Sequence, residues 1–219
     1  MFGFGDFDPI YFTGFLLGFV IGTTLHEFMH AYSALRLGDN LAASQGRVTL
    51  NPAAHFDPFG FIMGVLMAMG VGFLAWGRPV PVNPYALKYG RRGMAIVAVA
   101  GPLANLALAL ALLPLYKFGA TVLPTDVHQV LEYMILINIF LFAFNLIPIP
   151  PLDGFNILTG ILPNQWVTVL EPIRRYSLPI LLVMVFFLPY LGQRIGIELN
   201  PVFQAMEPVT TLLQRLILG

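Results

Sequence analysis

Long uncharged apolar runs separated by short polar segments dominate the chain, and several of them predict membrane-crossing helices. The first run follows Asp8, and its helical pattern extends to Arg36. The run between Arg92 and Lys117 is the clearest span, and another apolar run covers residues 133–152. A bilayer core of about 30 Å needs about 20 apolar residues in a helix, so each run is long enough to cross it.

The C-terminal part of the chain continues this pattern with interruptions. Three prolines that follow Ile147 closely predict that the helix begun at Tyr133 ends near Ile147. A further span is expected between Arg175 and Arg194. From about Pro201, apolar side chains recur at helical spacing, which favours an amphipathic helix at the membrane interface over a short span.

The segment between the first two clear spans is irregular. Residues 44–52, SQGRVTLNP, place β-branched residues between turn residues and predict a short strand. Residues 58–76 are apolar enough to cross the bilayer but are interrupted by glycines, and basic residues lie on both sides of them. If both basic loops are cytoplasmic, this segment is a re-entrant hairpin, the acidic N-terminus lies outside and the first helix runs inward. A single crossing remains the simpler interpretation of hydropathy alone.

The composition of the chain, taken together with these runs, indicates the fold class. The chain is 58% hydrophobic and 10% charged, whereas ordinary globular domains carry about 25% charged residues. A soluble fold of this size could not bury so much apolar surface. The sequence therefore predicts an all-α integral membrane protein, a polytopic bundle of about 4–6 membrane segments with a short membrane-associated β or re-entrant region. The zero net charge gives no indication of a basic face for nucleic acid, and the absence of cysteine excludes disulfides and thiolate ligands.

Candidate chemistry begins at HEFMH, residues 26–30, which fits H-E-x-x-H within the first helix. Residues four apart share a helix face, so His26 and His30 can present both imidazoles to one metal ion. Glu27, rotated by about 100°, can reach a water on that metal and take its proton. The alternative is a set of chance polar residues at a helix interface. Because ionisable groups are costly inside a membrane helix, the metal site is favoured.

A hydrolytic zinc site usually has three protein ligands and leaves one position for water, so a third ligand is needed. Asp153 directly follows the proline break at the end of a membrane helix, where an unwound chain can turn toward a partner helix. An interfacial Asp-Gly turn is the alternative for this residue. Glu132 and Glu171 are the other acidic candidates for the third ligand.

The combination of H-E-x-x-H in a membrane helix with N-x-x-P-x-P-P-L-D-G far downstream resembles the site-2 protease family of intramembrane zinc metalloproteases. The likeness covers the chain from the first helix to about residue 161. It implies that His26, His30 and Asp153 bind one catalytic Zn²⁺ and that Glu27 is the general base. It also implies that Asn145, the asparagine of the second motif, holds the substrate or the developing oxyanion.

Three weaker candidates accompany these residues. GPLAN, residues 101–105, resembles the small-residue stretch of an intervening family helix and suggests Asn105 as a substrate-binding residue, although close helix packing explains the stretch equally well. His55 is either a substrate-binding neighbour of the site or part of a polar turn. Asn138 precedes Asn145 by two helical turns, and we expect it to make an interhelical hydrogen bond.

The predicted function is hydrolysis of peptide bonds within or near transmembrane helices of other proteins, for signalling or for clearance of membrane remnants. In a departure from the family, 219 residues leave no room for PDZ-like or CBS-like domains, so we expect a compact form. The resemblance implies a site toward the cytoplasm, and we expect the plasma membrane of a prokaryote. We expect a single domain over residues 1–219, with a catalytic core at about 10–161 and C-terminal helices over 176–219. The expected partners are substrate helices and the lipid bilayer, with no nucleic acid. A zinc transporter and a non-catalytic scaffold are the alternatives.

Overall fold

The computed structural model describes residues 7–71 and 74–218, and every regular element in those ranges is helical. Its α-helices are α1 (Pro9–Arg36), α2 (Leu41–Ser44), α3 (Pro58–Ala68), α4 (Arg91–Gly119), α5 (Thr125–Asn145), α6 (Asp153–Ile161), α7 (Asn164–Leu170), α8 (Ser177–Leu182), α9 (Leu188–Ile195) and α10 (Pro201–Leu218). Short 3₁₀ turns cover Pro52–Ala54 and Glu171–Tyr176, and a π-helical turn, Val183–Phe187, joins α8 to α9.

Four helical stretches of the described chain are long and apolar enough to cross a membrane, which makes this an integral membrane protein. They are α1, α4, α5 and the run Asn164–Ile195, and they correspond to the four spans that the hydropathy pattern predicts. Helix α5 ends at Asn145, close to the predicted end at Ile147. Its termination follows from the prolines beyond it, which lack the backbone N–H that a helix needs.

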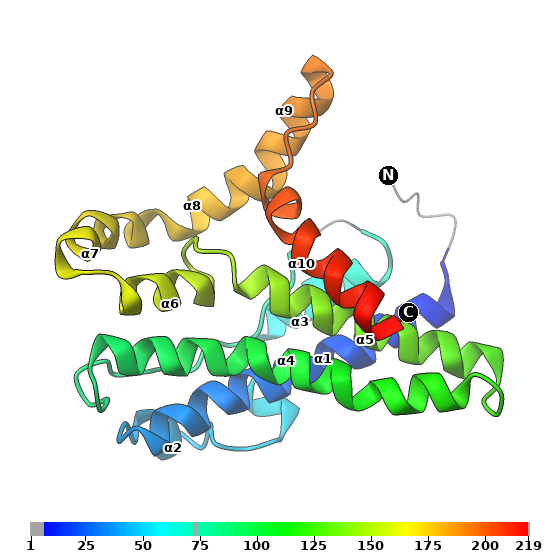
Figure 1. The fold of residues 1–219 in the computed structure, drawn as a ribbon, viewed down its shortest axis with the longest axis horizontal. Coiled ribbons are helices and arrows are strands. Elements are labelled where there is room, and N and C mark those ends of the chain that lie inside the picture. Colours follow the sequence, from blue (N-terminus) through cyan, green and yellow to red (C-terminus); the bar gives the residue numbers. More distant parts are fainter. Residues whose placement is uncertain (1–6, 72–73, 219) are drawn as a thin grey trace.

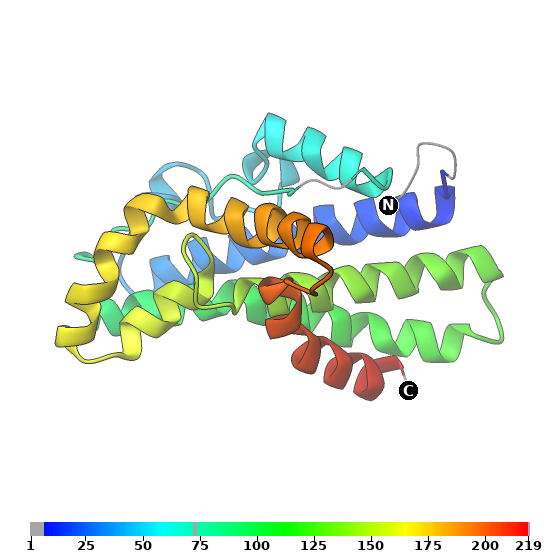
Figure 2. The ribbon, with the colours of Figure 1, turned by 90° about the horizontal axis from the view of Figure 1, so that it is seen from above.

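Helices α1, α4 and α5 lie side by side and form the centre of the molecule (Figures 1 and 2). Glycines at every fourth position of α1, Gly14, Gly18 and Gly22, face α5. An added Cβ at Gly18 would lie 2.9 Å from the Cα of Met134, so the two backbones are too close for a larger residue. Close approach through small residues is how membrane helices pack, because lipid supplies no hydrophobic driving force between them.

The strand predicted over residues 44–52 is not formed, so this part of the prediction is wrong. These residues make a turn and an irregular loop, and the described chain contains only an isolated antiparallel bridge, between Phe56 and Gly77. The reason lies in Arg47, which is 3% exposed and donates through its guanidinium to the carbonyls of Arg78 and Pro79. A side chain, not a backbone ladder, therefore joins this loop to the segment beyond α3.

The two ends of the apolar segment 58–76 lie next to each other. Helix α3 has 11 residues and is about 16 Å long, too short to cross a bilayer core of about 30 Å. The Phe56–Gly77 bridge joins the two ends of the segment, and Trp76 lies against Gly60 at the start of α3. Figure 2 shows α3 lying along α1.

The remaining helices surround the central three. Helix α6 packs on α4, and α10 packs on α5 through Val202, Met206 and Ile217 (Figure 1). The predicted C-terminal helix is thus formed, and its place at the membrane interface stays a prediction. The run through α8 and α9 projects away from the other helices, and only 11% of its most apolar stretch is buried within the chain.

Candidate metal centre

Helix α1 carries both histidines and Glu27 of the H-E-x-x-H motif. Asp8 caps its start by accepting hydrogen bonds from the backbone N–H groups of Ile10 and Tyr11, and Pro9 fits the first helical position. The helix is continuous through the motif, so His26 and His30 lie one turn apart. Their Nε2 atoms are 2.9 Å from each other, and each residue is only 8% exposed.

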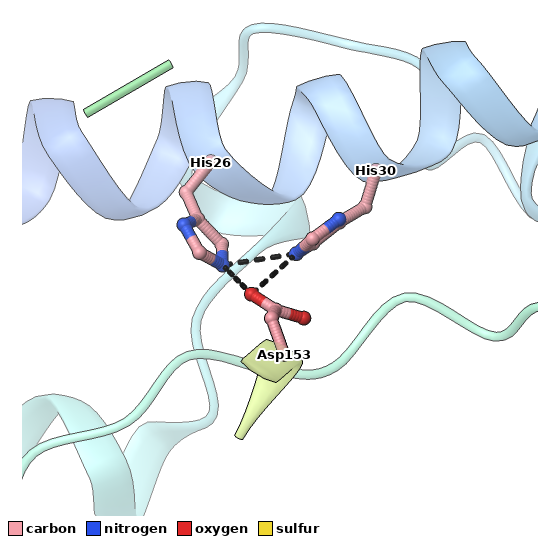
Figure 3. Close-up of side chains that lie close together, drawn as sticks. All are labelled: His26, His30 and Asp153. Carbon is pink, nitrogen blue, oxygen red and sulfur yellow. Dashed lines mark hydrogen bonds and ion pairs between the residues drawn. The ribbon is translucent and has the colours of Figure 1, made fainter. Parts of the chain in front are cut away.

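Asp153 reaches the two histidines from a different part of the chain. After α5 ends at Asn145, a proline-rich loop follows, and Asp153 begins α6. Gly154 allows this loop to be tight, since an added Cβ would lie 2.3 Å from the carbonyl oxygen of Leu146. Figure 3 shows the result: Asp153 Oδ2 lies 3.1 Å from Nε2 of His26 and 3.2 Å from Nε2 of His30.

The second nitrogen of each imidazole determines what the first can do. Nδ1 of His30 lies 2.8 Å from the carbonyl oxygen of Val97, and Nδ1 of His26 lies 2.8 Å from Oδ1 of Asn105. Both oxygens only accept hydrogen bonds, so both Nδ1 atoms carry the proton. Each neutral imidazole then presents an unprotonated Nε2 to the centre, which is the form that binds a metal.

Three electron-rich atoms therefore converge with no donor between them. The buried Oδ2 of Asp153 has no hydrogen-bond partner. Only a shared cation satisfies such a set, and two imidazoles with one carboxylate suit Zn²⁺.

Glu27 lies next to this set of three and is 9% exposed. Its Oε2 accepts a hydrogen bond of 3.1 Å from the backbone N–H of Val80, in the extended segment that follows α3. A cavity of about 310 Å³ is lined by Glu27, by the three converging residues and by Asn145. Asn145 donates through Nδ2 to the carbonyl of Leu141 in its own helix. The cavity thus holds five of the residues singled out from the two sequence motifs.

The other candidates lie elsewhere or have other contacts. Within the described residues, His26, His30 and Asp153 form the one group suited to hold a metal ion, and it includes neither Glu132 nor Glu171. Glu171 instead pairs with Arg174. The ring of His55 is fully buried, with Nε2 2.7 Å from the carbonyl oxygen of Thr49, and it does not line the cavity.

The structure adds partners that the motifs do not name. Asn105 lies at the wall of the cavity with its Oδ1 against Nδ1 of His26, and Asn138 makes the expected interhelical hydrogen bond, to Asn105. Gly101 is also essential to the geometry, because an added Cβ would lie 2.4 Å from Nε2 of His30. The G-P-L-A-N stretch was the available signal for Gly101 and Asn105. No side-chain pattern marks the backbone groups of Val97 and Val80.

Two imidazoles and a carboxylate beside a second carboxylate that can take a proton are typical of zinc hydrolases. Because this set lies among long apolar helices, the fold and the site define a membrane-embedded metallohydrolase.

Comparisons with known proteins agree with this class. The model of Peptidase family M50 matches residues 115–189, which include α5 and Asp153. YwhC of Bacillus subtilis is 40% identical over 151 residues, covering 66% of this chain and 67% of the relative. Rip2 of Mycobacterium tuberculosis is 34% identical over 185 residues, covering 81% and 68%. MJ0611 of Methanocaldococcus jannaschii is 31% identical over 183 residues, covering 81% and 85%.

All three relatives carry the description of a candidate zinc metalloprotease. No solved structure gives a significant match. The chain belongs to peptidase family M50, the site-2 protease family of intramembrane zinc metalloproteases. This confirms the family that the two sequence motifs indicated.

Proposed function

We propose that this protein cleaves peptide bonds within or near transmembrane helices of other membrane proteins, using one Zn²⁺ held by His26, His30 and Asp153. The observation that carries the proposal is the convergence of three unprotonated ligand atoms beside Glu27 in a cavity among apolar helices. Neither a lipid-facing nor a purely structural role requires a free carboxylate next to such a set.

Each residue of the cavity has a distinct task in this proposal. His26, His30 and Asp153 would hold the zinc ion, which when bound would supply a polarised water and a Lewis acid for the carbonyl of the scissile bond. Glu27 accepts the proton of that water and passes it to the leaving amine, which its position next to the ligand set allows. Asn145 lines the same cavity, and its amide is a candidate donor to the developing oxyanion.

The substrate must be unwound before it can react. A helical substrate hides its carbonyls in hydrogen bonds to N–H groups four residues on, so helices weakened by glycine or proline are the preferred substrates. The bilayer excludes water, so water has to enter the cavity from one membrane face. The basic residues around the site favour the cytoplasmic face of a prokaryotic plasma membrane.

The C-terminal helices and the glycine-rich segment complete the proposal. The meeting of Phe56 and Gly77 supports a re-entrant hairpin beside α1. Helix α10 packs on α5 through its apolar face, which supports one catalytic domain over residues 1–219 with its core at about 10–161.

The decisive test compares the wild type with Glu27→Gln. Because Glu27 is not a ligand, the purified variant should retain one zinc per chain while cleavage of a transmembrane test peptide falls by a factor on the order of 10² to 10⁴. Glu171→Gln, which changes an exposed acidic residue paired with Arg174, is the matched control and should cleave normally. Cleavage by Glu27→Gln at the wild-type rate would contradict the mechanism. Zinc uptake into vesicles by both proteins without any cleavage would favour a transporter.

A further inference from the structure

We propose that Asn138 and Asn105 form a buried amide relay that fixes the tautomer and orientation of His26. The relay runs from α5 through α4 to α1, so it connects the three central helices to one metal ligand. Its members are positioning residues, because neither amide touches the reacting atoms. The inference rests on the proposed role of His26 as a zinc ligand and adds what holds that ligand in place.

The relay is fully buried and fully hydrogen-bonded. Asn105 and Asn138 are both 0% exposed. Nδ2 of Asn105 donates to Oδ1 of Asn138 over 3.0 Å and to the carbonyl oxygen of Gly22 over 3.1 Å. Nδ2 of Asn138 donates to the carbonyl oxygens of Gly18 over 3.2 Å and Met134 over 2.8 Å. All four amide hydrogens of the pair are therefore used.

This pattern sets the direction of every hydrogen bond along the relay. The carbonyls of Gly18 and Met134 can only accept, so they select the NH₂ side of Asn138 and leave its Oδ1 toward Asn105. Asn105 must then turn its own NH₂ toward Asn138, which leaves Oδ1 for His26. An amide oxygen requires a donor, so Nδ1 of His26 carries the proton and Nε2 faces the metal position.

Flipping either amide would place two oxygens or two NH₂ groups against each other in a buried site. Such unpaired groups are costly because no water can replace the lost partner. Gly22 makes room for the pair: an added Cβ would lie 2.3 Å from Oδ1 of Asn138. Backbone carbonyls at one end thus determine the protonation of an imidazole at the other.

His30 shows why the relay is needed only for His26. Nδ1 of His30 already meets a backbone carbonyl, that of Val97, whose direction is fixed by α4 itself. His26 has no carbonyl at that place and relies on a side chain, which needs a second side chain to hold it. An interhelical hydrogen bond that served packing alone would not have to end on a metal ligand.

The test measures zinc affinity of the purified full-length protein in detergent, by competition with a chromophoric chelator. Asn105→Leu keeps the volume but removes the acceptor, so the zinc Kd should rise about 10- to 100-fold. Asn138→Leu should give a smaller rise, since the Gly22 carbonyl still holds one hydrogen of the Asn105 amide.

Thr24→Val is the matched control. It removes the hydrogen bond from the buried Thr24 side chain to the carbonyl of Val20 within α1, the helix that carries His26. It should leave the zinc Kd unchanged. The visible spectrum of bound Co²⁺ gives a second readout, which Asn105→Leu should alter and Thr24→Val should not. If Asn105→Leu fails to fold, Asn138→Leu decides, and wild-type zinc affinity in Asn138→Leu overturns the relay.

The outcomes separate this inference from the proposed function. Zinc binding by His26→Ala as tight as that of the wild type would overturn the metal site itself. Loss of zinc in His26→Ala together with wild-type affinity in Asn105→Leu would overturn only the relay. A loss in Asn105→Leu with equal thermal stability of the metal-free proteins supports positioning, because a packing defect would lower that stability.

Discussion

At the scale of single residues, the site depends on positions where nothing larger than a hydrogen fits. Gly101 of α4 faces both imidazoles, and an added Cβ there would lie 2.4 Å from Nε2 of His30 and 2.8 Å from Cε1 of His26. Real Cβ atoms do not approach other atoms so closely, so at least one ring must move. Gly101 therefore allows both the close packing of α4 on α1 and the placement of the two imidazoles.

Gly101→Ala should accordingly weaken zinc binding about 10- to 100-fold, because both ligand nitrogens are displaced from the common centre. Zinc affinity by chelator competition measures this directly. Gly119→Ala, near the end of the same helix, is the control, since its Cβ would meet only the flexible side chain of Leu123. Unchanged affinity in Gly101→Ala would mean that the imidazoles do not occupy the positions described here.

The sequence predicts the reactive side chains better than what surrounds them. His26, Glu27 and His30 follow from helical spacing, and Asp153 follows from a proline break that must be buried to be tolerated. The structure brings the three candidate ligands together. The carbonyl of Val97 and the N–H of Val80 were not predictable, because every residue except proline supplies the same backbone donor and acceptor, and only the fold decides where they point.

At the scale of elements, the extended segment after α3 is held against the site from two sides. The guanidinium of Arg47 binds the carbonyls of Arg78 and Pro79, and the N–H of Val80 binds Glu27. The segment therefore positions the proposed base, and Arg47 positions the segment. The prediction of a strand at residues 44–52 was wrong, because β-branched residues form a strand only where a neighbouring backbone is available to pair with them.

Arg47→Met should reduce kcat by a factor of about 10 to 100 while zinc content stays at the wild-type level, because a small misplacement of a catalytic group costs this much. The kcat of Arg47→Lys should lie between those of the wild type and Arg47→Met, because an ammonium group lacks the planar fork with which a guanidinium binds two carbonyls at once. Cleavage rates at saturating substrate, together with zinc analysis of the same samples, distinguish this result. Loss of zinc in Arg47→Met would place its effect on the ligand set instead.

At the scale of the whole molecule, one spacing organises the central helices. Glycines at positions 14, 18 and 22 of α1 allow α5 to approach, and the last of them also accommodates the asparagine pair. This four-residue spacing is visible in the sequence, and small residues at that interval are typical of membrane helix contacts. Hydropathy predicts which segments cross the membrane but not which faces meet, because lipid and a neighbouring helix are equally apolar.

The arrangement of the glycine-rich segment makes a prediction about the topology of the entire chain. Phe56 and Gly77 are bridged, and α3 is too short to cross, so the loops before and after this segment should open to the same membrane face. The turn between α4 and α5 should open to the opposite face, because α4 crosses once. Basic residues assign the first face to the cytoplasm.

The chain contains no cysteine, so single cysteines can report each loop without background. Gln45→Cys and Tyr85→Cys should react with a membrane-impermeant maleimide only in inverted vesicles, and Thr121→Cys only in right-side-out vesicles. All three positions are exposed, and zinc content verifies that each variant retains the site. Labelling of Gln45→Cys and Tyr85→Cys from opposite membrane faces would show that residues 58–76 cross the bilayer. The Phe56–Gly77 bridge could not then exist, because it would have to join opposite faces of the membrane.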